Sequence, residues 1–186
     1  YGVLVIEDAA HALGAEYKGS KVGSCKYSDM AVLSFHAVKH ITTGEGGMVL
    51  TNSRDFYDKL VMFRSHGITR DRQKLIERGR KKWFYEMHFL GFNYRITDIQ
   101  CALGLSQMNK LDDFIKRRRK IAYFYKEAFA DMEEVICLEE REYAVSSWHI
   151  FPVRINKNRD KVFDKLIVGN IGVNLHYIPI YLHPYY

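Results

Sequence analysis

The chain has 186 residues, with a hydrophobic content of 47%, a charged content of 27% and a net charge of +6, which are ordinary values for a globular domain. No apolar run approaches the ~20 residues of a membrane span, so we expect a cytoplasmic protein with no membrane partner. The three cysteines, at positions 25, 101 and 137, form no C-x-x-C pair, which favours reduced, buried thiols.

Three apolar runs in the first part of the chain predict strands of one sheet. Val3–Ile6 is continuous, apolar and rich in β-branched residues, as in a strand buried on both faces of a parallel sheet. Ala31–Phe35 and Met48–Thr51 are further runs of this kind. The predicted fold class is therefore α/β, with a mostly parallel sheet and flanking helices. Ligands of such sheets bind at the carboxyl ends of the strands.

Helical spacing follows the sheet. Arg54–Arg64 carries apolar residues at helical intervals after a Ser53 cap. Thr97 and Gln100 form a capping box, which predicts the start of a long helix. Asn109 is the position where this long helix could break.

The same helix is expected to bridge two domains. Residues 1–131 would form part of a large domain that ends with the helix, and residues 132–186 the beginning of a small α/β domain. In the small domain the pattern predicts a strand over Trp148–Ile155, a helix over Asp160–Val168 and a strand over Gly172–Tyr177.

Three polar side chains are expected at the carboxyl edge of the sheet. Asp8 follows the first apolar run, and the second run delivers Ser34 and then Lys39. Pyridoxal phosphate needs an amine to hold it as a Schiff base, an anion to keep its pyridine nitrogen protonated, and donors for its phosphate. Asp8 alone would suit a turn cap and Lys39 alone a solvated charge. The joint pattern predicts a pyridoxal phosphate site.

Five motifs surround and follow these residues. They are E-D-A-A-H from Glu7, S-F-H-A-V-K ending at Lys39, T-T-G-E-G-G-M-V-L-T-N from Thr42, R-S-H-G-I from Arg64 and G-F-N-Y-R-I-T-D from Gly91. Together they resemble the DegT/DnrJ/EryC1/StrS family of sugar aminotransferases. The resemblance covers about two thirds of the chain well and implies the type I fold of aspartate aminotransferase.

Carried over to this chain, the resemblance implies a role for each site residue. Lys39 would be the Schiff-base lysine and Asp8 the partner of the pyridine nitrogen. His11 would lie near the cofactor ring, and Ser34 would bind its phosphate. In the family, the asparagine equivalent to Asn93 reaches the cofactor phosphate of the neighbouring subunit, which implies a homodimer with a shared active site. The candidates for substrate binding are His36 and Arg95.

The lysine position separates two reactions within the family. Some relatives are dehydratases with histidine at this position, so Lys39 favours transamination, and His40 lies one position late for that substitution. The resemblance implies glutamate as the amino donor and a nucleotide-linked keto-sugar as the acceptor, with the freed Lys39 amine as general base.

The acceptor sugar is less clearly indicated. The motifs look most like those of enzymes that aminate C4 of a UDP-linked 4-keto-6-deoxy-N-acetylhexosamine, on the way to pseudaminic acid or a related bacterial glycan or flagellin sugar. Perosamine-type or dTDP-sugar aminotransferases are alternatives. A non-catalytic or regulatory member of the family is another.

The chain is expected to be a fragment, because it begins at Tyr1 inside an apolar run and family members are longer. The glycine-rich loop that binds the cofactor phosphate and most of the small domain would lie outside it. We therefore expect the segment alone to bind pyridoxal phosphate poorly and to be inactive.

Two further signals point to other classes of site. His36 and His40 have the i, i+4 spacing of a metal pair, but no third ligand is evident, so no metal is predicted. The basic run 116–120 suggests a solvated helix face. The basic stretch 70–82 could meet the diphosphate of a nucleotide substrate or be an exposed insertion. No nucleic-acid-binding module accompanies this charge, so no nucleic-acid partner is expected.

Overall fold

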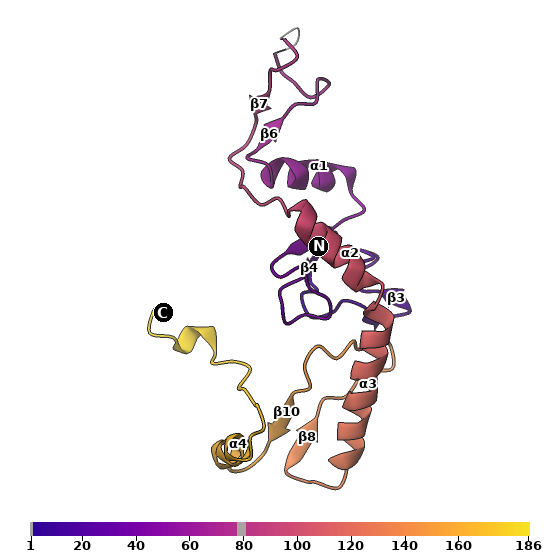
Figure 1. The fold of residues 1–186 in the computed structure, drawn as a ribbon, viewed down its shortest axis with the longest axis vertical. Coiled ribbons are helices and arrows are strands. Elements are labelled where there is room, and N and C mark those ends of the chain that lie inside the picture. Colours follow the sequence, from indigo (N-terminus) through magenta and orange to yellow (C-terminus); the bar gives the residue numbers. More distant parts are fainter. Residues whose placement is uncertain (1, 78–80) are drawn as a thin grey trace. The chain divides into compact units, whose positions relative to one another are not determined.

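The computed structural model describes residues 2–77 and 81–186 and divides into two compact units (Figure 1). The first unit holds Tyr1–Arg119 and Arg141–His149, and the second holds Lys120–Glu140 and Ile150–Tyr186. Helix α3 (Leu111–Ala128) belongs to both. The division of the complete protein into domains at residue 131 stays a prediction.

The main sheet of the first unit has three strands in the order β1-β4-β5. β1 (Ile6–Asp8) pairs in parallel with β4 (Met30–Ser34), while β5 (Gly47–Leu50) pairs antiparallel with β4. The α/β class is confirmed, but the third apolar run does not add a parallel strand. The reason lies in the connection 35–46, which contains no helix, because a parallel return usually needs a helical crossover.

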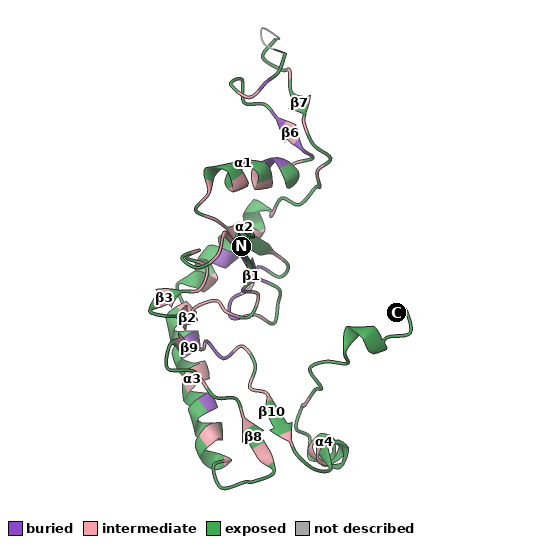
Figure 2. Ribbon diagram, turned by 180° about the vertical axis from the view of Figure 1, so that it is seen from behind, coloured by how far each residue is buried: buried purple, intermediate pink, exposed green. Residues whose placement is uncertain are grey.

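The burial of β1 differs from the expectation. The strand begins only at Ile6, and the apolar side chains before it are exposed, with 72% of the Val3 surface accessible. β1 lies at the edge of this sheet, with β4 as its one neighbouring strand among the described residues, and no described element packs on its side chains closely enough to bury them. Figure 2 shows buried residues in several parts of the chain, and they include Ala31 and Leu33 on β4 as well as Met62, Ile115 and Trp148. The core cluster consists of Ala9, Leu33, Phe35 and Ile41.

Short strands and one helix complete the first unit. β2 (Glu16–Tyr17) pairs with β3 (Ser20–Lys21) and with β9 (Ala144–Val145). β6 (Ile68–Thr69) and β7 (Glu86–Met87) pair antiparallel. Helix α1 (Arg54–Phe63) has the predicted Ser53 cap, whose side chain accepts from the Phe56 amide at 3.3 Å.

The long helical region is broken where the sequence allowed it. Helix α2 (Asp98–Met108) starts at the predicted capping box of Thr97 and Gln100, and its C-cap is Asn109. α3 then begins at Leu111 and ends at Ala128, slightly earlier than expected. Cys101, on α2, is exposed and not buried as expected.

The second unit contains one of the two strands predicted for the small domain, in shortened form, and one strand that was not predicted. β8 (Val135–Cys137) pairs antiparallel with β10 (Val153–Ile155), and helix α4 (Arg159–Val168) lies close to its predicted position. The strand predicted to start at Trp148 is shorter because Trp148 adopts a φ of 50°, outside the range of a strand. Gly172–Tyr177 forms no strand in the described chain, where it has no pairing partner, and a short 3-10 helix, η1 (Ile180–Leu182), follows it.

Candidate active site

The parallel register of β1 and β4 places two predicted site residues at one edge of the sheet. Asp8, the last residue of β1, pairs with Val32, so Ser34 lies at the carboxyl end of β4 just beyond it. The Asp8 carboxylate is exposed, and one of its oxygens accepts a hydrogen bond from the Ala10 amide at 3.1 Å. Its other oxygen makes no hydrogen bond with the described residues and can accept one from a ligand.

Lys39 lies in the irregular connection 35–46, which leaves the same edge. The Ser34 hydroxyl accepts from the His36 amide at 3.4 Å, and the His36 carbonyl accepts from the Lys39 amide at 2.9 Å. These two turns fix the backbone of Lys39 relative to Ser34. The Lys39 side chain is half-buried, and within the described chain its Nζ forms no hydrogen bond or ion pair. An available amine therefore stands close in sequence to the strand end.

The glycine-rich run after Lys39 is fixed on both sides. The Phe35 amide donates to the Gly46 carbonyl at 2.8 Å, and the Phe35 carbonyl accepts from the Thr43 amide at 2.9 Å. A Cβ on Gly46 would overlap the Thr43 hydroxyl, so only glycine fits there. From α2, the Gln100 side chain donates to the Glu45 carbonyl at 2.8 Å. The run thus closes the Lys39 loop and attaches it to α2.

A cluster of three histidines lies beside Lys39. The ring of His149 packs against the ring of His11, with centroids 4.2 Å apart, and against the ring of His40 at 5.3 Å. His40 is buried, and its Nε2 donates to the Ser147 carbonyl at 3.2 Å. The Nδ1 atoms of His40 and His149 are buried and find no hydrogen-bond partner among the described residues.

The electrostatics of the cluster favour neutral imidazoles. Burial lowers the pKa of His40 to about 4, and the nearby Arg118 guanidinium acts in the same direction. Burial also lowers the pKa of His149 to about 4, and the neighbouring His11, His40 and Lys39 contribute to the decrease. Both rings are therefore uncharged near neutral pH. The sequence motifs assigned no role to His40 or His149, since His149 reaches the loop only through folding.

Two arginines of α3 hold the segment that carries His149. Arg118 Nη1 donates to the carbonyls of Trp148 at 3.3 Å and His149 at 3.0 Å. Arg119 Nε donates to the Ser146 carbonyl at 2.9 Å. The prediction that run 116–120 is a solvated face is therefore wrong for these two residues. Arg118 follows the buried Ile115 at a spacing of three, and this spacing could have indicated a packed position.

Asn93 and Arg95 lie on an extended segment after β7. The backbone of Asn93 forms a bridge with Ser65, and the Tyr94 amide donates to the Arg64 carbonyl at 2.9 Å. Both predicted side chains are exposed, and they form no hydrogen bond or ion pair within the described part of the chain. Neither side chain therefore makes a polar contact with Lys39 among the described residues.

His36, the other candidate for substrate binding, is exposed at the start of the Lys39 loop. Its Nε2 lies 3.7 Å from a Glu45 carboxylate oxygen, and its Nδ1 accepts from the Val38 amide at 3.4 Å. His40 points instead to the Ser147 carbonyl. The two rings therefore have separate partners, and the spacing of four residues reflects a loop and not a helix.

The basic stretch lies in the loop between β6 and β7. Positions 78–80 fall outside the described residues, and Lys81, Lys82 and Trp83 are exposed. The first part of the loop is anchored by Glu86, whose carboxylate accepts from the Ile76 and Glu77 amides at 2.7 Å each. Both expectations for this stretch, a diphosphate contact or an exposed insertion, stay open.

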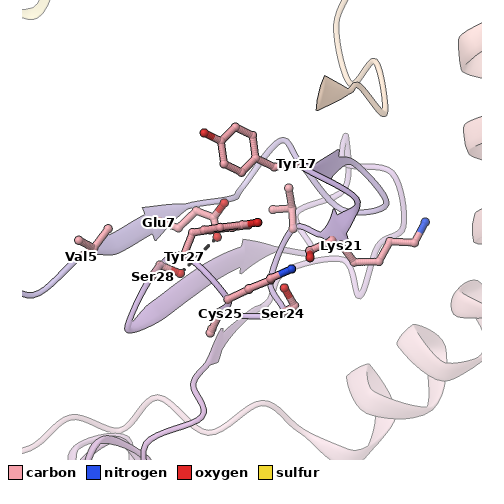
Figure 3. Close-up of a pocket in the computed structure, with 11 residues that line it drawn as sticks. Val5, Glu7, Tyr17, Lys21, Ser24, Cys25, Tyr27 and Ser28 are labelled. Atoms are coloured by element: carbon pink, nitrogen blue, oxygen red, sulfur yellow. Dashed lines mark hydrogen bonds between the residues drawn. The ribbon is translucent and has the colours of Figure 1, made fainter. Parts of the chain in front are cut away.

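A cavity of about 280 Å³ lies elsewhere in the first unit (Figure 3). Its wall includes Glu7, which accepts from the Ser28 hydroxyl at 3.5 Å, and the perpendicular rings of Tyr17 and Tyr27. Glu7 and Asp8 point to opposite faces of β1 because side chains alternate along a strand. None of the predicted site residues lines this cavity, so it is separate from the edge that carries Asp8 and Ser34.

Two features are absent from the described residues. No group of three or more histidine, cysteine, aspartate or glutamate side chains is arranged to hold a metal ion within residues 2–77 and 81–186. Over the same residues, no helix has both the length and the apolarity to cross a membrane.

Comparison with known proteins gives a match along the whole chain. The model of the DegT/DnrJ/EryC1/StrS aminotransferase family matches residues 1–186. A UDP-4-amino-4,6-dideoxy-N-acetyl-beta-L-altrosamine transaminase of Campylobacter jejuni is 38% identical over 190 residues, which cover 100% of this chain and 48% of the relative.

Solved structures agree with this match. The aminotransferase PseC of Helicobacter pylori, involved in the biosynthesis of pseudoaminic acid, superposes with a TM-score of 0.84 at 34% identity, over 97% of this chain and 47% of that one. The PLP form of the putative sugar aminotransferase Spr1654 of Streptococcus pneumoniae superposes with a TM-score of 0.85 at 29% identity, over 98% and 46%. The chain thus has the fold of about half of a PLP-dependent sugar aminotransferase of type I, and it spans about half the length of the relatives it matches.

Proposed function

Because this chain belongs to the DegT/DnrJ/EryC1/StrS aminotransferase family, we propose that it forms part of a pyridoxal-phosphate-dependent sugar aminotransferase. The complete enzyme would move an amino group from glutamate to the C4 keto group of a nucleotide-linked 4-keto-6-deoxy sugar, most consistently a UDP sugar. The observation that carries the proposal is the β1–β4 register, which sets Asp8 and Ser34 at the strand ends from which the Lys39 loop departs.

The side chains at this edge fit the cofactor. The unpartnered Asp8 oxygen suits a protonated pyridine nitrogen, since a buried or partly buried cation needs an anion beside it. The available Nζ of Lys39 suits covalent attachment of an aldehyde, and the Ser34 hydroxyl suits a phosphate oxygen. His11, on the turn after Asp8, offers a ring that could lie near the cofactor ring.

Each side chain then has a definite task. Pyridoxal phosphate supplies the electron sink that stabilises negative charge on the carbon that loses a proton. Asp8 keeps the pyridine nitrogen charged, and Ser34 orients the phosphate. Lys39 Nζ holds the cofactor and, once released from it, carries a proton between the reacting carbons. The half-buried position of Lys39 limits the access of water to this amine.

A homodimer would complete the site. Asn93 and Arg95 are exposed and unengaged in the described chain, as expected for side chains that act on a partner's cofactor and substrate. Apolar residues around them are exposed as well, and such a surface favours burial against another subunit. They are Leu90, Phe92, Tyr94, Ile99 and Leu105.

The first experiment tests the cofactor. The full-length protein should show the visible absorption band of a lysine-bound cofactor, and Lys39→Ala should abolish both this band and amino transfer. The control is Lys59→Ala, which removes an exposed amine from α1 and should leave both unchanged. A full-length protein without the band, or a Lys39→Ala variant that keeps turnover, would overturn the proposal.

The second experiment tests the substrate. Mass spectrometry should detect an amino sugar when the full-length enzyme is incubated with glutamate and UDP-4-keto-6-deoxy-N-acetylhexosamine. Matched reactions with GDP- and dTDP-linked 4-keto-6-deoxy sugars test the perosamine and dTDP-sugar alternatives. The UDP preference rests on the name of the Campylobacter jejuni relative. If a GDP- or dTDP-linked sugar gives a higher kcat/KM, the proposed preference for UDP sugars is wrong. We propose a cytoplasmic enzyme of bacterial surface glycan or flagellin sugar synthesis.

A further inference from the structure

The histidine cluster joins three segments that are far apart in the sequence. His11 lies on the turn after β1, His40 directly follows Lys39, and His149 lies in the segment that α3 holds through Arg118. The His149 ring is the one that packs against both of the others. It therefore occupies the position through which the carboxylate side of the predicted site contacts the lysine side.

We propose that His149 is a positioning residue for Lys39. This proposal rests on the proposed function, because His149 lies beside the site to which the cofactor would bind. The ring of His149 sets the separation between the Asp8–His11 turn and the Lys39 loop, and it does so by its shape and packing, without transferring a proton.

Two observations favour packing over acid-base chemistry. The Nδ1 of His149 is buried and has no hydrogen-bond partner among the described residues, so no described group is placed to exchange a proton with it. The groups that face the ring are the cations Lys39 and Arg118 and two further imidazoles, His11 and His40. None of them supplies the negative charge that would keep a protonated imidazole in place.

The anchoring of His149 also suits a positioning role. Its carbonyl accepts from Arg118 at 3.0 Å, and the Ser147 carbonyl, two residues earlier, accepts from His40 at 3.2 Å. The segment is thus fixed to α3 on one side and to the residue after Lys39 on the other. A ring fixed in this way can transmit its position to the Lys39 backbone, because packed interiors have little free volume to absorb a displacement.

The test compares His149→Ala with His149→Phe in the full-length protein. Phenylalanine keeps a planar ring but removes both ring nitrogens, and alanine removes the ring. Amide hydrogen exchange, measured without cofactor, should be at least about tenfold faster for the peptide 35–46 in His149→Ala, as expected for local loosening. The exchange in His149→Phe should stay close to that of the unmodified protein.

Cofactor binding gives the second readout. The dissociation constant of pyridoxal phosphate should rise about tenfold in His149→Ala and less than about threefold in His149→Phe, a difference set by positioning alone. Unchanged exchange of the loop in His149→Ala would overturn the inference, and so would a phenylalanine variant as impaired as the alanine variant. Faster exchange together with no cofactor band in the unmodified protein would instead overturn the proposed function and leave the positioning role in place.

Discussion

The two regions that carry the predicted site residues differ in how their side chains are placed. The Lys39 loop is closed by Phe35 and attached to α2, and its neighbour His40 is buried. The segment with Asn93 and Arg95 is held through its backbone, but both side chains are exposed and form no hydrogen bond or ion pair with the described residues. The Lys39 loop is thus surrounded by groups of its own chain, whereas Asn93 and Arg95 expose their side chains. This contrast supports a site that is assembled from two subunits.

The largest effect on stability is expected where the backbone near the Asn93–Arg95 segment packs closely. Gly67 has a φ of 69°, and a Cβ at this position would overlap the Phe89 carbonyl. We expect Gly67→Ala to lower the free energy of unfolding by about 3 kcal/mol, through backbone strain and overlap. Urea denaturation of the full-length protein measures this. Gly172→Ala is the control, because its Cβ would meet open space, and an equal loss in both variants would contradict the prediction.

Acid should lower the stability that the histidine cluster gives to the region of the Lys39 loop. The pKa of His40 and of His149 is about 4 in the folded protein, against about 6.5 in an unfolded chain. Between these values the unfolded state binds more protons, so the stability from this pair is complete above pH ~6.5 and decreases as the pH falls toward ~4. We expect a loss of about 2 kcal/mol, since partial exposure and mutual repulsion reduce the sum of the two shifts.

The contribution of the cluster can be separated from that of carboxylates by a difference measurement. Urea denaturation at pH 7 and pH 5 is compared in the unmodified protein and in His149→Phe, which has one titrating ring less. The decrease in the free energy of unfolding from pH 7 to pH 5 should be smaller in His149→Phe than in the unmodified protein. An identical decrease in both proteins would show that the cluster does not contribute to acid sensitivity.

A smaller effect is expected where the Lys39 loop meets α2. The Gln100 side chain accepts from the Thr97 amide at 3.0 Å and donates to the Glu45 carbonyl at 2.8 Å. Gln100→Ala removes both hydrogen bonds and should cost about 1 kcal/mol in the free energy of unfolding. Gln107→Ala, on the same helix, has no such bond to lose among the described residues and is the control.

The comparison also explains which parts of the molecule the sequence could predict. Asp8, Ser34 and Lys39 lie at or next to the ends of strands, and apolar runs indicate strand ends directly. The capping box at Thr97 and the cap at Ser53 were equally local signals, and the helices begin there. The family resemblance suggested roles that the local sequence pattern could not indicate. The roles of Asn93 and Arg95 are of this kind, and they stay predictions.

The parts that could not be predicted depend on distant contacts. The packing of His149 against His11 and His40 requires the segment 146–149 to be carried to the loop by α3. The positive φ of Trp148 interrupts an apolar run that alone favours a strand. Likewise, the exposure of Val3–Ile6 depends on which distant segments cover these side chains, which the run itself cannot indicate.

The smallest effect on stability belongs to Asn93, and it gives the sharpest test of a shared site. Because the Asn93 side chain is exposed, Asn93→Ala should change the free energy of unfolding by less than about 0.5 kcal/mol. The same variant should lose cofactor affinity and activity if Asn93 acts on the partner's cofactor. Stability and function would then separate at this position, whereas a residue that serves its own chain would affect both.

Mixed dimers of Lys39→Ala and Asn93→Ala distinguish a shared site from two independent ones. If each site takes Lys39 from one subunit and Asn93 from the other, a mixed dimer holds both substitutions in one site and none in its second site. Random mixing at equal amounts should therefore restore about a quarter of the unmodified activity from two inactive proteins, since half the dimers are mixed and each has one intact site. With independent sites every site carries one substitution, so no recovery on mixing would contradict the shared arrangement and leave the exposure of Asn93 to be explained within its own chain.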